Sequence, residues 1–265
     1  MKKIAWILAA ALLAGTAAPA QTIAPFKDGD RVVYLGNSIT DGGHYHSYIW
    51  LYYMTRFPEM NLRMYNAGIG GETAGGMFKR LDGDVFSKRP TVLTVTFGMN
   101  DTGYMEYNGD NPEAFGEARY KECFENYKKM EKRLEGLDGV RVVMIGSSPY
   151  DETARIEGNT PLRGKNAVMQ RVVEFQKASA DAHGWEFIDY NAPLVEVGRQ
   201  QQAVDPSFTL TGGDRVHPDN DGHMVMAYLF LKAQGFAGKE VADIRIDAAK
   251  GEVLESANCK ISNLR

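Results

Sequence analysis

Four short segments, far apart in the sequence, hold the residue types that acyl transfer from an ester requires. The first contains a serine, the second and third contain glycines and an asparagine, and the last contains a histidine three residues after an aspartate. Together they supply a nucleophile, a base to take its proton, and donors for the oxygen that becomes negative. In chain order the segments are 36–40 (GNSIT), 66–73 (NAGIGGET), 98–101 (GMND) and 214–218 (DRVHP).

The serine and the histidine form a plausible nucleophile and base. A serine hydroxyl is almost wholly protonated at neutral pH, so Ser38 needs an adjacent base. A histidine can take that proton and return it to the leaving alcohol. Asp214 is close enough in sequence to His217 to accept a hydrogen bond from Nδ1, which leaves Nε2 for Ser38.

The donors for the oxyanion are expected from the middle two segments. We predict the backbone N–H groups of Ser38 and Gly71 and the side-chain amide of Asn100. Asn100 is preferred over Asp101 because a neutral amide donates a hydrogen bond and a carboxylate does not. Asp101 is then expected to hold its loop. A glycine at position 71 lets the backbone come close to the substrate oxygen.

Each segment taken alone also has a purely structural explanation. Ser38 could cap a helix after a strand, and Gly68, Gly70 and Gly71 could form only a tight turn. Asn100 and Asp101 could likewise be turn residues. Only the presence of all four segments, in this order, favours an active site over these alternatives.

The four segments resemble the signature of the SGNH hydrolases, the GDSL-like esterase and lipase superfamily, over residues 28–235. That resemblance implies a three-layer α/β/α fold of flavodoxin type with a central parallel sheet. It implies an ester hydrolase without a cofactor or metal. It also assigns catalytic roles to Ser38, Asp214 and His217, and an oxyanion hole to Ser38, Gly71 and Asn100.

The first segment departs from the family pattern at one position. The family usually has an aspartate where this chain has Asn37. Asparagine keeps the size and the hydrogen-bonding capacity but removes a negative charge beside the serine. Catalysis is expected to survive, with a change in the electrostatics around Ser38.

The hydrophobic pattern independently predicts an α/β domain. Apolar runs typical of parallel strands covered on both faces alternate with longer helical stretches, which implies a parallel sheet of about five strands. In such sheets ligands bind at the carboxyl ends of the strands, where Ser38, Gly71 and Asn100 fall. Strands are expected at 31–36, 62–66, 92–97, 141–145 and 185–190, and helices at 46–57, 112–137, 161–183 and 218–234.

The two ends of the chain differ from this domain. Residues 1–20 have two lysines, an apolar run and a terminal Ala-Pro-Ala, the pattern of a secretory signal peptide. We therefore expect the domain to occupy 21–236 of an exported protein, periplasmic or secreted. Residues 237–265 are a C-terminal extension in which 244–247 alternates like a strand, and the sequence leaves its packing open.

Composition limits the possible partners. Loss of Lys2 and Lys3 with the signal peptide takes the formal net charge of −4 two units lower, to −6, which gives no support for nucleic-acid or anionic-membrane binding. The two cysteines, Cys123 and Cys259, could pair in an exported protein, or Cys123 could be a small buried apolar residue. The oligomeric state is not readable.

Cofactor and metal motifs are incomplete. The glycines after the first two strands match neither the phosphate-binding nor the dinucleotide-binding pattern. His44 and His46 form an H-x-H pair, but no cysteine or glutamate cluster completes a metal site beside them. His183 and His223 are expected to be structural.

The substrate is indicated only weakly. The loops 101–111 and 147–163 are polar and contain tyrosines that could stack on sugar rings or could anchor their own loops. We therefore predict an O-acetylesterase acting on carbohydrate, with His44, Tyr104 and Tyr150 as candidate substrate contacts. A lysophospholipase or thioesterase of the same superfamily is the first alternative, and a non-catalytic carbohydrate-binding protein is a remote one.

Overall fold

The computed structural model describes residues 22–264, so the predicted signal peptide lies outside the described residues. The described chain divides into two compact units, one up to Ala237 and one from Gly238 onward. The first unit contains the four segments singled out above.

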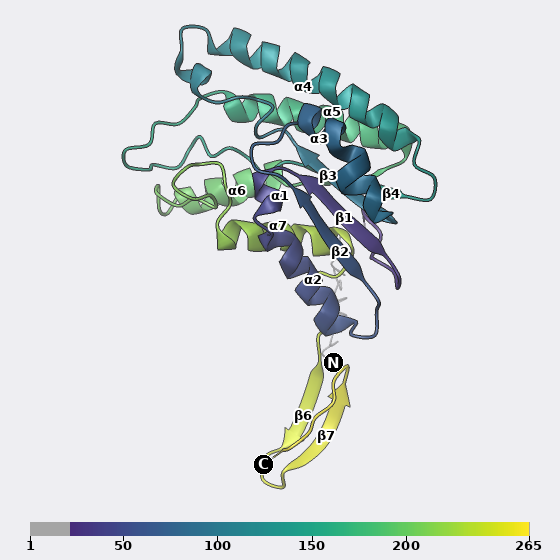
Figure 1. The fold of residues 1–265 in the computed structure, drawn as a ribbon. Coiled ribbons are helices and arrows are strands. Elements are labelled where there is room, and N and C mark those ends of the chain that lie inside the picture. Colours follow the sequence, from purple (N-terminus) through teal and green to yellow (C-terminus); the bar gives the residue numbers. More distant parts are fainter. Residues whose placement is uncertain (1–21, 265) are drawn as a thin grey trace, which may run out of the picture. The chain divides into compact units, whose positions relative to one another are not determined.

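The first unit is built on a five-stranded parallel sheet (Figure 1). The strand order β2-β1-β3-β4-β5 is that of flavodoxin-type doubly wound folds. The prediction of a three-layer α/β/α fold with about five parallel strands is therefore confirmed. The strands are β1 (Arg31–Gly36), β2 (Arg63–Gly68), β3 (Val92–Phe97), β4 (Arg141–Gly146) and β5 (Glu186–Asp189).

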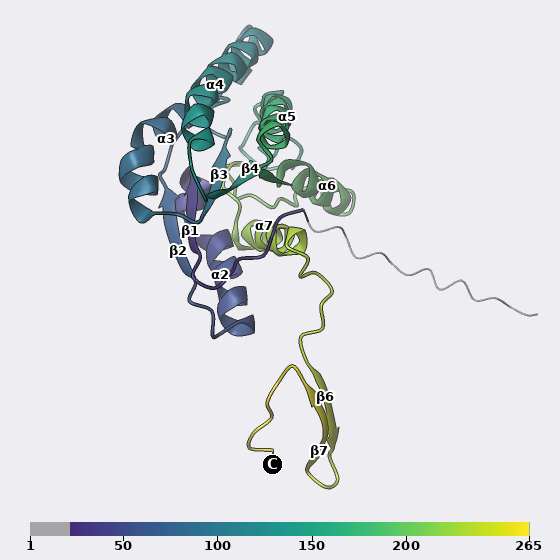
Figure 2. The ribbon, with the colours of Figure 1, turned by 90° about the vertical axis from the view of Figure 1, so that its right-hand side faces the viewer.

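Helices cover both faces of this sheet (Figure 2). In β1, Val32 and Tyr34 pack with α2 and α7 on one face, whereas Val33 and Leu35 pack with α3, α4 and α5 on the other. This explains the uninterrupted apolar run of the strand, since successive side chains point to opposite faces. The helices are α1 (Ser38–Asp41), α2 (His44–Arg56), α3 (Ala74–Arg80), α4 (Pro112–Glu135), α5 (Lys165–His183), α6 (Asn191–Gln202) and α7 (Asn220–Ala233), with short helical turns η1 (Leu81–Val85), η2 (Phe86–Lys88) and η3 (Met105–Asn108).

One predicted helix begins later than expected. The sequence predicts a helix at 161–183, but α5 begins at Lys165, after Gly164 with a φ of 90°. Residues 161–164 instead continue the loop, where the Leu162 N–H donates to the Tyr150 hydroxyl at 3.1 Å. No helical region of residues 22–264 combines the length and the apolar character needed to cross a membrane.

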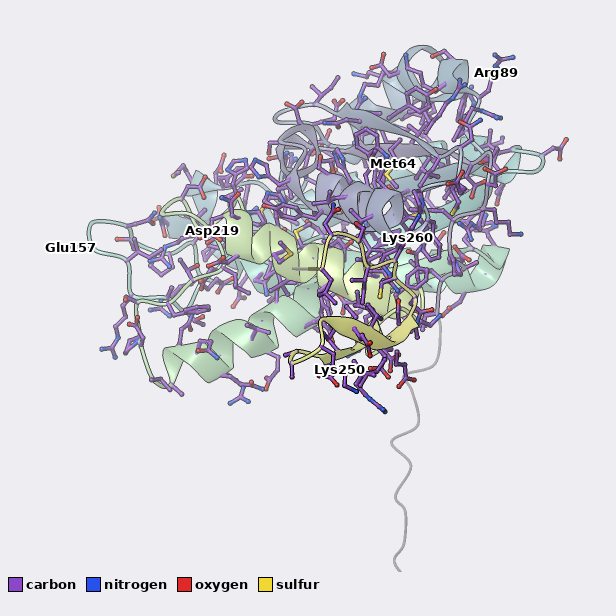
Figure 3. The ribbon with its side chains drawn as sticks, turned by 90° about the horizontal axis from the view of Figure 1, so that it is seen from below. Met64, Arg89, Glu157, Asp219, Lys250 and Lys260 are labelled. Carbon is purple, nitrogen blue, oxygen red and sulfur yellow. The ribbon has the colours of Figure 1, made fainter. Side chains whose placement is uncertain are left out.

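The second unit contains an antiparallel hairpin of β6 (Asp243–Asp247) and β7 (Glu252–Ala257). The alternating residues 244–247 fall in its first strand, as the sequence indicated. Lys250, labelled in Figure 3, lies in its turn and pairs with Asp247 at 3.6 Å.

The two cysteines form no disulfide: Cys123 is buried within α4, and Cys259 follows β7 with a free thiol.

Imidazole and phenol rings form much of the contact between α2 and α7. The ring of His223 stacks on Tyr45, with centroids 6.2 Å apart, and on His44 at 5.0 Å. His223 is 5% exposed, and no described residue bonds its buried Nδ1. The positive charge of a protonated His223 ring would therefore lack a hydrogen-bond acceptor at Nδ1.

This burial makes stability sensitive to acid. Burial, with the charges of His44 and His46, lowers the pKa of His223 from 6.5 to about 4. Between these values only the unfolded chain binds the proton, so the free energy of unfolding should fall as the pH drops from 6.5 to 4. His223→Phe keeps the stacked ring and should reduce this slope by up to about 1.4 kcal/mol per pH unit. Urea unfolding at several pH values measures it, and equal slopes in the two proteins would contradict the assignment.

Candidate active site

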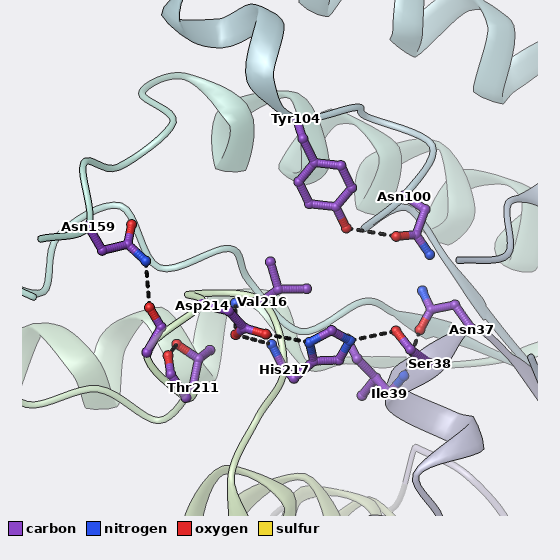
Figure 4. A network of polar contacts seen from close by, with 12 residues as sticks. Asn37, Ser38, Ile39, Asn100, Tyr104, Asn159, Thr211, Asp214, Val216 and His217 are labelled. Atoms are coloured by element: carbon purple, nitrogen blue, oxygen red, sulfur yellow. Dashed lines mark hydrogen bonds and ion pairs between the residues drawn. The ribbon is translucent and has the colours of Figure 1, made fainter. Parts of the chain in front are cut away.

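Ser38, His217 and Asp214 form one hydrogen-bonded chain (Figure 4). Ser38 Oγ lies 2.7 Å from His217 Nε2, and His217 Nδ1 lies 2.6 Å from an oxygen of Asp214. Ser38 follows β1, whereas His217 lies in the loop before α7, 179 residues further on. The side chains of His217 and Asp214 are 49% and 51% exposed, so the site is open at the surface.

The helix that begins at Ser38 is capped by its neighbour. Asn37 is buried, and its Oδ1 accepts a hydrogen bond from the Ile39 N–H at 3.0 Å. Asn37 is therefore the cap, and the alternative that Ser38 serves as one is wrong. A carboxylate oxygen could accept the same bond, which explains why asparagine can stand where the family has aspartate. Ser38 is in the first turn, so its N–H has no partner within the helix.

The second segment is pressed against this helix. Asn66 donates from Nδ2 to the Asp41 carbonyl at 2.9 Å and accepts from the Gly68 N–H at 2.9 Å. A Cβ at Gly68 would lie 2.2 Å from the Asp41 nitrogen, so only glycine permits this approach. Gly68 thus has a packing role beyond that of a turn.

Arg80, on α3, ties the first two segments together. Its guanidinium donates to the carbonyl oxygens of Gly36 at 3.2 Å and Ala67 at 2.9 Å, and it forms an ion pair with Glu72. The ends of β1 and β2 are thereby held by one side chain. The sequence analysis did not single out this arginine.

Gly71 lies in a turn after β2 with a φ of +75°, a left-handed conformation that favours glycine. The position that a Cβ would occupy is open, with no atom within 4 Å. No described residue accepts a hydrogen bond from its N–H. The predicted donor is thus free to bind a ligand atom.

The third segment is bonded to the second. The Asn100 Nδ2 donates to the Glu72 carbonyl at 2.9 Å, and Asn100 Oδ1 accepts from the Tyr104 hydroxyl at 2.7 Å. Asp101 is buried and accepts from the N–H groups of Ala74 and Gly98. Burial raises the pKa of Asp101 despite these bonds. The carboxylate fastens the loop, the task expected of it.

Asp214 is held in place by its own turn. One oxygen accepts from the backbone N–H groups of Val216 and His217, at 2.9 and 3.0 Å, and the other faces the His217 ring. Partial burial alone would raise the pKa of Asp214, but the bond from the His217 ring and these backbone bonds lower it below its usual value. The carboxylate stays ionised where an esterase works.

Arg215, between the acid and the base, anchors the fourth segment. It is 1% exposed and has a φ of 66°. Its guanidinium donates to the carbonyls of Asp151, Ala154 and Asn159, at 3.1, 2.9 and 2.7 Å, and to Asn159 Oδ1 at 3.0 Å. The triad loop is therefore bound to the loop before α5. Sequence analysis missed this residue, because its partners are distant backbone atoms.

The three candidate substrate contacts differ in position. Tyr150 is 3% exposed and its hydroxyl accepts a bond within its own loop, which agrees with the alternative that this tyrosine anchors its loop. His44 is exposed, and its Nδ1 lies 3.0 Å from Asn220 Oδ1 at the start of α7. Tyr104 is partly buried and contacts Asn100 instead of pointing away from the protein.

The possible metal pair has another explanation. His46 is buried, stacks on Tyr34 with centroids 4.9 Å apart, and bonds the Thr40 carbonyl through Nε2 at 3.1 Å. Within residues 22–264 no group of three histidine, cysteine, aspartate or glutamate side chains is placed to hold a metal ion.

Residues 34–225 match the GDSL-like Lipase/Acylhydrolase family. With this site and fold, the chain belongs to that family and is a carboxylic ester hydrolase.

Individual relatives extend the comparison. An acetylxylan esterase from Geobacillus stearothermophilus is 28% identical over 225 residues, which are 78% of this chain and 95% of that protein. The crystal structure of Axe2, an acetylxylan esterase from the same organism, is 22% identical with a TM-score of 0.63, covers 81% of this chain and 96% of its own, and shows the shared fold. A gut microbial diltiazem-metabolizing enzyme is 62% identical with a TM-score of 0.87, over 92% of this chain. This chain spans only 55% of that enzyme's length.

Gly71→Ala tests the second segment. The added Cβ would enter the open space at the turn, where the substrate oxygen is expected, so kcat should fall by about tenfold or more with little change in KM. Gly139→Ala is the matched control, because Gly139 has a similar φ of +67° and equally open surroundings, and it lies before β4, at the opposite end of the strands from the site. Both variants should lose similar stability, and an equal kcat in both would remove Gly71 from the oxyanion hole.

Asp214→Asn tests the orientation of His217. The amide can still accept the two backbone bonds, but its NH₂ would face Nδ1 and favour the wrong tautomer of His217. We expect kcat to fall by about 10²–10⁴-fold, less than for Ser38→Ala or His217→Ala, with no loss of folding by circular dichroism. Unchanged turnover would mean that a different carboxylate orients the base.

Proposed function

We propose that this protein is an exported serine esterase that removes small acyl groups, chiefly acetyl, from carbohydrate. The observation that carries the proposal is the chain of hydrogen bonds from Ser38 through His217 to Asp214. Neither a binding module nor a structural protein requires this arrangement.

The proposed reaction gives each of these groups one task. His217 Nε2 takes the Ser38 proton as Oγ attacks the ester carbonyl, and Asp214 stabilises the imidazolium that forms. The carbonyl oxygen becomes negative and accepts bonds from the Ser38 and Gly71 N–H groups and the Asn100 amide. His217 then protonates the leaving alcohol, and water repeats the sequence to release the acid and free Ser38.

Two observations support a decorated polymer as the substrate. The half-exposed side chains of His217 and Asp214 leave the reacting atoms accessible to a sugar that is part of a chain. The acetylxylan esterase relative, by its name, cleaves acetyl groups from xylan. A small acyl group on a large alcohol fits an open site, because the alcohol needs no enclosing pocket. Export, indicated by residues 1–20, would bring the enzyme to such polymers.

The diltiazem-metabolizing relative supports a second candidate substrate class, small molecules such as diltiazem. The same nucleophile and oxyanion donors would serve both classes, and only the alcohol side would differ. Relative kcat/KM on acetylated xylan and on diltiazem would rank the two.

The proposal is tested by hydrolysis of p-nitrophenyl acetate, butyrate and octanoate, with Ser38→Ala as control. We expect turnover that falls with acyl length and is lost in the variant by about 10³-fold or more. Release of acetate from acetylated xylan should then follow, with the same dependence on Ser38. A preference for octanoate would indicate a lysophospholipase or thioesterase instead. Binding to xylan with no Ser38-dependent turnover would indicate a binding protein.

A further inference from the structure

The orientation of the Asn100 amide is fixed by two partners. The Glu72 carbonyl can only accept a hydrogen bond, so the Asn100 atom 2.9 Å from it must be the nitrogen. The Tyr104 hydroxyl then donates to the oxygen at 2.7 Å. In Figure 4 the nitrogen lies on the side of the amide that faces Asn37 and Ser38. One of its two N–H bonds goes to Glu72, and the other remains for a ligand.

Tyr104 packs against the buried side chain of Lys165, whose pKa burial lowers to about 7. The ammonium of Lys165 lies 4.1 Å from the centre of the Tyr104 ring. Lys165 is 0% exposed and donates to the carbonyls of Met99 and Gly103, at 2.6 and 2.5 Å, and to Thr102 Oγ1 at 2.8 Å. All three acceptors belong to the loop that carries Asn100 and Tyr104. In its protonated form the ammonium attracts the ring face, so Lys165 fixes both the loop and the tyrosine.

We propose that Tyr104, which packs on Lys165, is a positioning residue for the oxyanion hole. Its hydroxyl holds the Asn100 amide so that an amide N–H points toward the reacting carbonyl. The inference rests on the proposed function, because it concerns the same oxyanion. It replaces the prediction that Tyr104 stacks on a sugar.

The physical reason is the cost of the wrong amide orientation. An asparagine side chain can rotate by half a turn, and its oxygen would then face the developing negative charge and repel it. With both partners present, a rotation sets two oxygens, of Asn100 and Glu72, against each other, and the Tyr104 hydroxyl would have to accept a bond from the amide instead of donating one. Without the Tyr104 hydroxyl the amide keeps only the Glu72 bond, so it is held less firmly in the position that directs its second N–H at the substrate oxygen.

The hydroxyl can donate at any pH at which an esterase works. Burial, with the charges of Asp214 and Asp101, raises the pKa of Tyr104 to about 12. The phenol therefore keeps its proton, and the Asn100 oxygen always has a donor.

Tyr104→Phe is the direct test, because it keeps the ring over Lys165 and removes only the hydroxyl. We expect kcat on p-nitrophenyl acetate to fall by about tenfold with KM nearly unchanged, less than for complete loss of an oxyanion donor. Tyr107→Phe is the matched control. It removes another hydroxyl of the same loop, bonded to the Thr102 carbonyl at 2.9 Å, that does not contact Asn100. Its kcat should stay within about twofold of wild type.

A double-mutant cycle separates positioning from a general structural effect. If Tyr104 acts through Asn100, Tyr104→Phe should cost nothing further in an Asn100→Ala background. Three results would overturn the inference: an unchanged kcat in Tyr104→Phe, an equal loss in both backgrounds, or a rise of KM confined to acetylated xylan, which would make Tyr104 a sugar contact. Absence of Ser38-dependent turnover in the wild type would instead refute the proposed function, and the inference with it.

Discussion

The site depends on the register of β1, β2 and β3, whose carboxyl ends lie side by side. Gly36 is paired with Gly68 and Leu35 with Val95, so the three parallel strands stop at nearly the same height. Ser38, Gly71 and Asn100 each follow a strand end by two or three residues, and their donors therefore converge. A shift of one residue in any pairing would turn the apolar side chains of that strand to the wrong face, so the packing of the core also fixes the geometry of the site.

The loops beyond the strands are held by buried or largely buried basic side chains. Lys165, Arg215 and Arg80 all donate to backbone carbonyl oxygens, and only Arg80 also has a carboxylate partner at short range. Carbonyl groups in a loop lack the partners that a helix or sheet provides, and leaving them buried without one is costly. A guanidinium or ammonium supplies several donors at once, and this offsets part of the cost of burying its charge.

Much of this structure could be predicted from the sequence, and the omissions have physical causes. Long apolar runs gave all five strands to within a few residues. The helices α3 and α6 were missed because α3 has two glycines in seven residues, and α6 has a proline and a glycine within twelve. The spacing in 214–218 placed His217 beside Asp214, but nothing local indicated that Tyr150 is buried or that Arg215 and Lys165 bind distant carbonyls. Local sequence patterns predict secondary structure, but they do not predict which distant loops come into contact.

The position of Arg215 between Asp214 and His217 couples the loop before α5 to the catalytic base. The guanidinium is hydrogen-bonded to residues of the segment 151–159, so a displacement of this loop would also displace the neighbouring catalytic base. A loop that moved freely could be exchanged for another to suit a new alcohol without affecting the base. Here such a graft would displace the imidazole unless it kept oxygen acceptors at the same places. Substitutions in this loop are therefore tolerated only where they leave its backbone in the same place.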